Sequence, residues 1–175
     1  MLPSNIHTLG SACFNGSLGY ITELTLPHIT KVGNWCFSNR SVKSGYTSAL
    51  TKIHLGDVNM TNSSGSGFQP FQGNPLKLIE FGDGTLSIIA YGNNNVFAYI
   101  DKTTSADPLK IVVHAVNPPA LSRGTSNFTQ TSYYTIYVPD ISVDTYKAAS
   151  YWSEVASHIK PLSSYPNPSE LLYLE

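Results

Sequence analysis

Charge is scarce in this sequence. Asp, Glu, Lys and Arg make up 12% of the 175 residues, and ten basic side chains against eleven acidic ones leave a net charge of −1. That share is about half of what soluble domains usually carry. Nucleic-acid binding depends first on accumulated Lys and Arg, so the lack of a basic stripe predicts that the chain does not bind nucleic acid. Asn, Ser, Thr and Tyr supply the polar surface instead, a profile typical of secreted and surface-displayed proteins.

Long apolar runs and a targeting signal are also missing. No stretch approaches the eighteen or more apolar residues of a membrane span, which predicts no membrane insertion. The opening MLPSNIHTLG lacks the basic and apolar regions of a secretory signal, so the sequence predicts an export signal, if one is used, outside this chain. Two cysteines, Cys13 and Cys36, are too few for a disulfide scaffold.

No catalytic motif stands out. The sequence has no G-x-S-x-G elbow, phosphate loop or paired carboxylates. FGDGTL (81–86) lacks the alternating acidic ligands that Ca²⁺ needs. No two histidines have metal-ligand spacing, and all are predicted to be scattered over the surface: His7, His28, His54, His114 and His158. The prediction is a protein that is not an enzyme, with no catalytic residue, metal or cofactor.

What the sequence does have is a repeat. IHTLGSACF (6–14) and ITKVGNWCF (29–37) carry Ile, Gly, Cys and Phe in the same slots. A Gly-x-x-x-Phe pattern recurs at Gly67 and at Gly124, and Asn93 replaces the glycine in one more copy. We expect the repeated phenylalanines to stack in an apolar column with the two cysteines beside them, a repeat core of Phe14, Phe37, Phe71, Phe97, Phe128, Cys13 and Cys36.

A short segment of alternating apolar residues follows most copies. The segments are ITELTLP (21–27), LTKIHLG (50–56), PLKLIEFG (75–82), PLKIVVHA (108–115) and YTIYVPD (134–140). Such alternation predicts strands with one buried face. The side chains predicted to face the core are Leu24, Leu26, Ile53, Leu55, Ile79, Phe81, Val112, Ile136 and Val138. Variable lengths between phenylalanine and strand indicate insertions confined to one loop of a stacked coil.

The layout I-x-x-I-G-x-x-x-F, with the tail HAVNPPALS (114–122) and TIYVPDISVDTYKAASYWSEVASHIKPL (135–162), resembles the BspA-like, treponemal-type leucine-rich repeats of bacterial surface proteins. The resemblance covers about 6–162. It implies a mainly β fold with short helices: a right-handed leucine-rich-repeat-like solenoid with a parallel sheet and a C-terminal capping helix. Within a single domain we expect about five coils over 1–139, the capping helix over 140–162 and a tail over 163–175.

Both ends of the stack carry expectations. Asp140 or Ser142 can cap a helix that Pro161 ends, with apolar positions at Val143, Tyr146, Ala149, Trp152, Val155 and Ile159. Tyr146 and Trp152 are interpreted as core packing of this cap. At the other end the first strand presents an unpaired edge. We expect upstream repeats or another subunit to cover that edge.

Two local questions remain open on the residues alone. Cys13 and Cys36 are interpreted as free, buried packing thiols, with a disulfide as the alternative that distance permits and side-chain direction disfavours. Leu78, Ile111, Val113 and Tyr137 are predicted to lie side by side on the outer face of the sheet as a contact patch. The alternative is that the long loops 38–49 and 61–67 fold over the sheet and bury it.

The predicted function follows from the resemblance. It implies an extracellular or cell-surface protein that adheres by binding a protein or glycan ligand. The alternative is a phage virion or tail component that uses the same repeat for attachment or assembly, and an enzyme is the disfavoured third class. Repeats specify a scaffold, whereas function lies in sites placed on it, so the ligand itself is not predicted.

Overall fold

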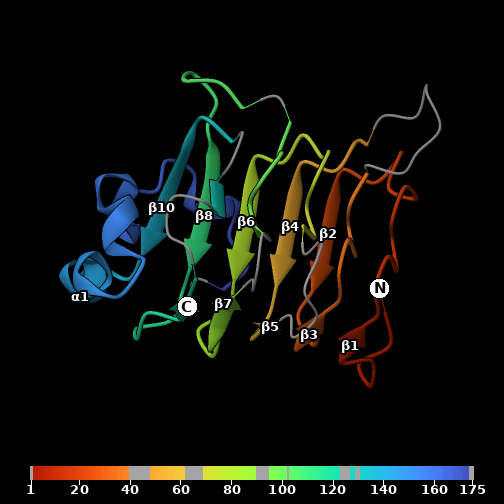
Figure 1. Cartoon of the computed structure of the whole chain (residues 1–175), viewed down its shortest axis with the longest axis horizontal. Helices are drawn as coiled ribbons and strands as arrows, with labels where there is room; N and C mark the ends of the chain where they lie inside the picture. Colours follow the sequence, from red (N-terminus) through yellow and green to blue (C-terminus); the bar gives the residue numbers. More distant parts are fainter. Residues whose placement is uncertain are drawn as a thin grey trace.

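The protein is an array of parallel β-strands with a few short helices at one end (Figure 1). This description rests on a computed structural model of the chain. The residues that the structure describes are 2–39, 48–61, 69–89, 95–101, 103–122, 127–128 and 131–173. The fold is mainly β, in the class that the sequence predicts.

Six strands form the main sheet, and every neighbouring pair is parallel. Each of the five central segments predicted from alternation contributes one strand, and a sixth comes from the C-terminal region. In order across the sheet the strands are β11 (Ile159–Pro161), β10 (Tyr134–Val138), β8 (Leu109–Val113), β6 (Leu78–Phe81), β4 (Lys52–Leu55) and β2 (Glu23–Leu26).

One row of aliphatic side chains crosses the whole sheet on its inner face. The residues that stand opposite one another in register are Leu24, Ile53, Ile79, Ile111, Ile136 and Ile159. All but Leu24 are almost completely buried, and each buried aliphatic side chain stabilises the fold by about 1.5–3 kcal/mol. In-register repetition is thus how successive strands share one core.

In strand β8, the residues that face the core are not the ones that the sequence predicts. Ile111 and Val113 lie in the main core, whereas Val112 faces outward and joins a second apolar cluster. The prediction that placed Ile111 and Val113 outside and Val112 inside is therefore wrong. Ile111, Val112 and Val113 are all apolar, so this end of the strand gives no alternation from which the inward and outward positions can be assigned.

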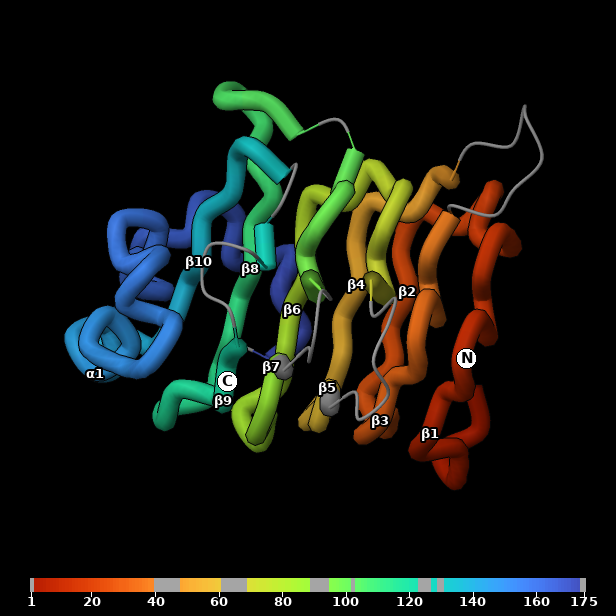
Figure 2. The backbone as a smooth tube through the Cα atoms, in the orientation of Figure 1, coloured from red at the N-terminus to blue at the C-terminus, as the bar shows by residue number. Residues whose placement is uncertain are grey.

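A second row of short strands lies beside the main sheet (Figure 2). β1 pairs with β3, and β5, β7 and β9 form a three-stranded parallel sheet. The backbone N–H of Asn59 donates to the carbonyl of Thr30 at 2.8 Å and joins the two groups. The bounds are β1 (Thr8–Leu9), β3 (Lys31–Val32), β5 (Asn59–Thr61), β7 (Ser87–Ile89) and β9 (Ala120–Leu121). Each of the main strands β2, β4, β6 and β8 is thus followed in sequence by a short strand. We call one main strand, the short strand after it and the turn that follows a layer.

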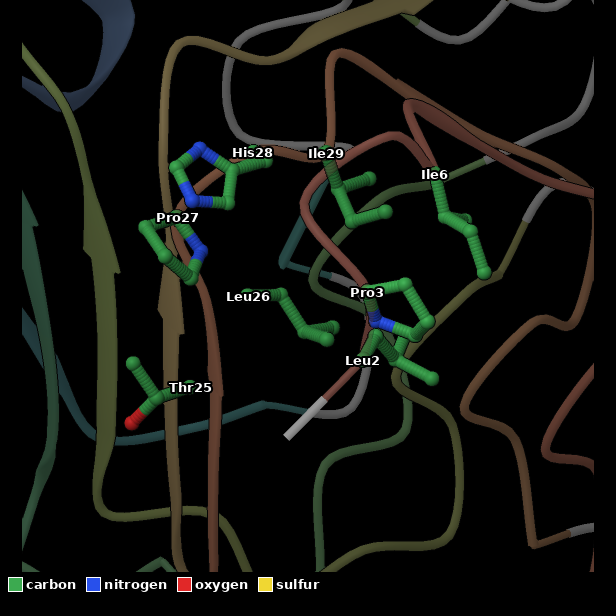
Figure 3. A pocket seen from close by; sticks show the side chains of 8 residues that line it. All are labelled: Leu2, Pro3, Ile6, Thr25, Leu26, Pro27, His28 and Ile29. Atoms are coloured by element: carbon green, nitrogen blue, oxygen red, sulfur yellow. The ribbon is translucent and has the colours of Figure 1, made fainter.

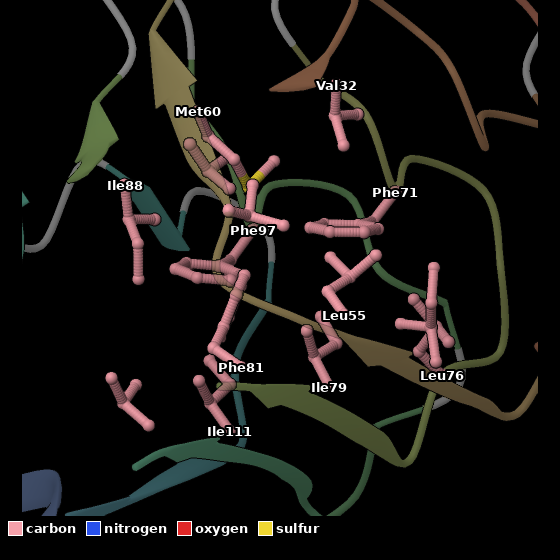
Figure 4. Packing of buried hydrophobic residues seen from close by; sticks show 14 of the residues in the cluster. Val32, Leu55, Met60, Phe71, Leu76, Ile79, Phe81, Ile88, Phe97 and Ile111 are labelled. Atoms are coloured by element: carbon pink, nitrogen blue, oxygen red, sulfur yellow. The ribbon is translucent and has the colours of Figure 1, made fainter. Parts of the chain in front are cut away.

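The phenylalanines of successive layers stack in a column. Centroid separations from Phe14 through Phe37, Phe71 and Phe97 to Phe128 are 5.9, 5.9, 6.3 and 5.1 Å, and no interplanar angle exceeds 17°. Figure 4 shows Phe71 and Phe97 surrounded by aliphatic side chains of the neighbouring strands. Phe14, at the end, is only partly buried. The residues Gly67, Asn93 and Gly124 of the repeat pattern lie outside the described residues.

The two cysteines differ in environment. Both are free, but Cys36 is fully buried beside the ring column whereas Cys13 is exposed. The prediction that Cys13 is buried is therefore wrong: Cys13 lies in the first layer of the described structure, and no other described layer covers it. Burial, with the neighbouring Cys13 thiol, raises the pKa of Cys36 to about 12.

The C-terminal cap is not one helix. It comprises η2 (Asp140–Ser142), α1 (Val143–Ala148) and η3 (Ser153–His158) before β11. Ala149 is extended and Tyr151 adopts a φ of 62°, which ends α1 and turns the chain. Neither Asp140 nor Ser142 caps a helix through its side chain; Asp140 Oδ1 instead accepts the backbone N–H of Ser163 at 2.9 Å. The continuous helix expected to run to Pro161 is thus replaced by three short helical segments and a strand.

Two aromatic residues anchor this cap to the last layers. Tyr146 and Trp152 are buried with their rings edge to face at 5.0 Å. The Tyr146 hydroxyl donates to the carbonyl of Ala115 at 2.7 Å, and the indole N–H of Trp152 donates to that of Pro119 at 2.8 Å. Both residues therefore close the C-terminal end of the stack.

The opposite end is more open. Among the described strands of the main sheet, β2 has β4 as its one neighbour. The N-terminal segment leaves a hollow of about 10 Å³ against the end of β2, room for at most one water molecule. It is lined by Leu2, Pro3, Ile6, Thr25, Leu26, Pro27, His28 and Ile29 (Figure 3). The two ends of the array thus differ sharply in how well their last layer is covered.

Candidate functional site

The outer face of the main sheet gathers polar and apolar side chains in register. His54 on β4 stands opposite Glu80 on β6, and Glu80 stands opposite Val112 on β8. Val112 in turn stands opposite Tyr137 on β10. Alternation along a strand brings His114, two residues beyond Val112, to the same face. This face, rather than the core side, is the candidate site.

Glu80 lies at the centre of this face and is fully buried. His54 Nδ1 lies 2.5 Å from one of its carboxylate oxygens, and His114 Nε2 lies 2.8 Å from the other. An ionised carboxylate only accepts hydrogen bonds, so both ring nitrogens are assigned as donors. His54 Nε2 makes no hydrogen bond within the described structure and lies 3.7 Å from Glu23 Oε1. Polar contacts thus run in a line from Glu23 on β2 through His54 on β4 and Glu80 on β6 to His114 at the end of β8.

The pKa of Glu80 reflects this environment. Burial alone would raise it, but hydrogen bonds from His114, His54 and the backbone N–H groups of Leu172 and Tyr173 outweigh burial and lower the pKa from 4.5 to about 2. Glu80 is therefore an ionised acceptor at neutral pH. Its hydrogen-bonding capacity is met by side chains of the sheet and by the C-terminal segment.

The C-terminal segment 162–173 crosses the outer face of the sheet (Figure 2, dark blue, behind the strands). We call this segment the strap. Leu172 N and Tyr173 N donate to the Glu80 carboxylate at 3.0–3.2 Å. Lys52 Nζ lies 3.1 Å from Glu170 Oε2, and the Tyr165 hydroxyl donates to Glu170. The strap thus spans from β10 at the cap to β4.

Apolar contacts complete the docking of the strap. Leu78, Val112 and Tyr137 on the sheet form one buried cluster with Tyr165 and Leu171 of the strap. The rings of Tyr137 and Tyr165 meet edge to face at 4.9 Å. The strap itself folds as η4 (Leu162–Ser164) and η5 (Pro168–Glu170) with extended residues between them. An apolar strip and a buried carboxylate together hold it.

The predicted contact patch is therefore not exposed. Leu78 and Tyr137 do lie on the outer face, but the strap covers them, and Ile111 and Val113 are in the core. The alternative that loops cover the sheet concerns residues that lie mostly outside the described ones. What covers this part of the sheet is the strap, which lies in the segment that the sequence predicts to be a tail.

The prediction that all five histidines lie scattered over the surface is wrong for two of them. His54 is fully buried and the His114 side chain is 7% exposed, both on Glu80. His7 and His28 are exposed, and the His158 ring stacks on Tyr134 at 4.1 Å. The available signal was that His54 and Glu80 both occupy outward positions of predicted strands. Strand register was needed to bring them together.

The chemistry open to this cluster is recognition of hydrogen-bond donors. A general base must reach the proton that it removes, whereas the strap N–H groups occupy the carboxylate of Glu80. Within the described residues, no group of three His, Cys, Asp or Glu side chains is arranged to hold a metal ion. No helix in the described part of the chain has the length and apolar character needed to cross a membrane.

A comparison of this sequence with protein-family models and with curated proteins finds no match.

Proposed function

We propose that the chain is a non-enzymatic, leucine-rich-repeat-like solenoid scaffold of a bacterial cell-surface protein, and that it acts in adhesion by binding a protein or glycan. The observation that carries the proposal is the repetition: parallel strands in register, with one ring per layer stacked at 5.1–6.3 Å. Such an array needs only neighbour-to-neighbour contacts and offers a long surface to a partner. The resemblance to BspA-like repeats supplies the expected location and role.

Exposed aromatic side chains are the first surface groups to test. Tyr20 is 99% exposed in the turn before β2, and Trp35 is 37% exposed in the turn that precedes Phe37. Tyr and Trp are enriched in protein-binding surfaces. Neither residue belongs to the buried core cluster, so we expect a variant that lacks both rings to fold.

The test uses beads that carry the purified chain on cultured epithelial cells and on arrayed glycans. We expect retention several-fold above beads that carry the heat-unfolded chain, with competition by free folded chain. A Tyr20→Ala, Trp35→Ala variant locates the surface, and Ser4→Ala, at an exposed residue of the same end, is its matched control. Equal retention of folded and unfolded chains on every surface would contradict the proposal.

The alternative function is that of a phage virion or tail component. The observation that favours it is the open end, where β2 has one neighbour among the described strands and Phe14 is only partly buried. Light scattering over a concentration series separates the two functions. An oligomer covering that end favours the virion component, and a stable monomer favours a surface protein whose first layer is covered by further repeats.

A further inference from the structure

The strap occupies a site that is built to hold a peptide. We propose that the outer face of the main sheet binds a short acidic-aromatic peptide of a partner, and that the strap fills this site in cis until such a peptide displaces it. This inference deepens the proposed binding function and rests on it. The reasoning begins with how the strap is attached.

The strap is joined to the sheet by side chains rather than by a strand ladder. The strand pairing between β11 and β10 ends at Pro161, just before the strap begins. Beyond that point, the backbone N–H groups of Leu172 and Tyr173 bond to the Glu80 side chain, and that of Ser163 bonds to the Asp140 side chain. Backbone hydrogen bonds from Tyr165 to Leu162, from Glu170 to Asn167 and from Leu171 to Pro168 form local turns within the strap. Detachment therefore leaves every pairing of the main sheet intact.

Detachment would uncover a surface that needs another occupant. Leu78, Val112 and Tyr137 would become an exposed apolar strip, and exposed strips of this kind mark partner sites. The Glu80 carboxylate would lose two of its hydrogen-bond donors, and the face would keep a free Lys52 at one side. An apolar strip, an acceptor for backbone N–H groups and a cation together define a peptide site.

The strap shows which peptide fits. An aromatic ring at position 165 meets Tyr137, a glutamate five residues later pairs with Lys52, and the leucine after it enters the apolar cluster. Burial raises the pKa of Glu170, but hydrogen bonds from Tyr165 and Lys52 outweigh it and hold that pKa below its ordinary value. Pro166 and Pro168 restrict the segment before binding, which lowers the entropy cost of docking. The peptide that fits therefore has an aromatic residue, then any four residues, then Glu and Leu.

Tethering sets the competition. A segment attached to its own site acts at an effective concentration on the order of millimolar. A free peptide of the same sequence therefore cannot compete at micromolar concentration with an intact strap. Weakening the strap in the chain, while the peptide keeps its own residues, removes that competition.

The experiment measures fluorescence anisotropy of a labelled synthetic peptide with the sequence of residues 162–173 against the full chain. Leu171→Asp places a charge in the apolar cluster, and Leu172→Asp is the matched control because the Leu172 side chain is 50% exposed. We expect Leu171→Asp to bind the peptide at least about tenfold more tightly than the wild type or Leu172→Asp. A peptide that itself carries Leu171→Asp should not bind.

Two results would overturn the proposal: no peptide binding by a folded Leu171→Asp chain, or equal binding by all three chains. Circular dichroism establishes folding, and Glu170→Gln is the milder second variant if Leu171→Asp does not fold. Hydrogen exchange gives an independent measurement, since the amides of Leu172 and Tyr173 should exchange faster than those of β6 and β8. Equal rates would make the strap part of the core and refute displacement. Bead retention is unaffected by these failures, so they are distinguishable from failure of the proposed function.

Discussion

The ring column predicts that neighbouring phenylalanines are energetically coupled. Phe37 and Phe71 lie 5.9 Å apart with planes 4° from parallel, an offset stack, and both are fully buried. Aromatic pairs in this geometry contribute about 0.5–1.5 kcal/mol beyond their buried area. Replacing either ring with leucine keeps an apolar side chain but removes the stacking.

A double-mutant cycle isolates that contribution. Each of Phe37→Leu and Phe71→Leu should lower the free energy of unfolding by roughly 1–2 kcal/mol through lost volume, and by the stacking contribution in addition. The double variant should lose about 0.5–1.5 kcal/mol less than the two single losses together, because the stack can be lost only once. The matched control pairs Phe37→Leu with Phe128→Leu, whose rings are separated by two others in the column.

Urea unfolding followed by tryptophan fluorescence, from Trp35 and buried Trp152, and by circular dichroism provides the free energies. The remote pair should be additive within about 0.5 kcal/mol. Additivity of the adjacent pair, or equal coupling in both pairs, would refute the reasoning. Unfolding curves that differ between the two probes would show separate unfolding of the ends, and the cycle would then be evaluated for each transition.

Three further predictions test other features. Glu80→Gln should be less stable than the wild type at neutral pH by roughly 2–3 kcal/mol. Because the pKa of Glu80 is about 2 in the folded chain and ordinarily 4.5, urea titrations should show this difference vanishing as the pH falls from 4.5 to about 2. A difference that stays constant with pH would contradict the assignment. Gly33→Ala should cost about 1–3 kcal/mol in thermal unfolding, since a Cβ there would lie 2.5 Å from Ser11 N, whereas Gly10→Ala, with nothing within 4 Å, should be nearly neutral; equal costs would be inconsistent with close layer contact. A thiol reagent at pH 8 should titrate one cysteine in the folded chain, the exposed Cys13, and two after denaturation, and any other count would contradict the burial of Cys36.

The strands were predictable because polar and apolar residues alternate along most of them. In β4, β6 and β10 the alternation of apolar residues gave both the strand and its phase. The same reasoning assigned the wrong residues of β8 to the core, because the strap buries Val112 while the core buries Ile111 and Val113. A strand apolar on both faces carries no phase until its cover is known.

The cap and the strap were harder to predict for different reasons. The spacing of apolar residues over 143–159 fits a helix, yet the backbone at Ala149 and Tyr151 departs from it. The sequence of the strap has no period, since two prolines and short turns interrupt it. Its docking depends on Glu80, which comes from a distant segment of the chain. Sequence patterns report local structure, whereas this site was assembled by strand register and by a contact between residues about ninety positions apart.

The strap also has a mechanical consequence. It ties β10 to β6 and β4 through Tyr165, Glu80 and Lys52, so a force pulling on the C-terminal layers is shared by two strands that do not pair with β10. β2 and the first layer have no such tie among the described residues. A chain stretched between its two ends should therefore come apart first at the N-terminal side, and the layers under the strap should yield last and together.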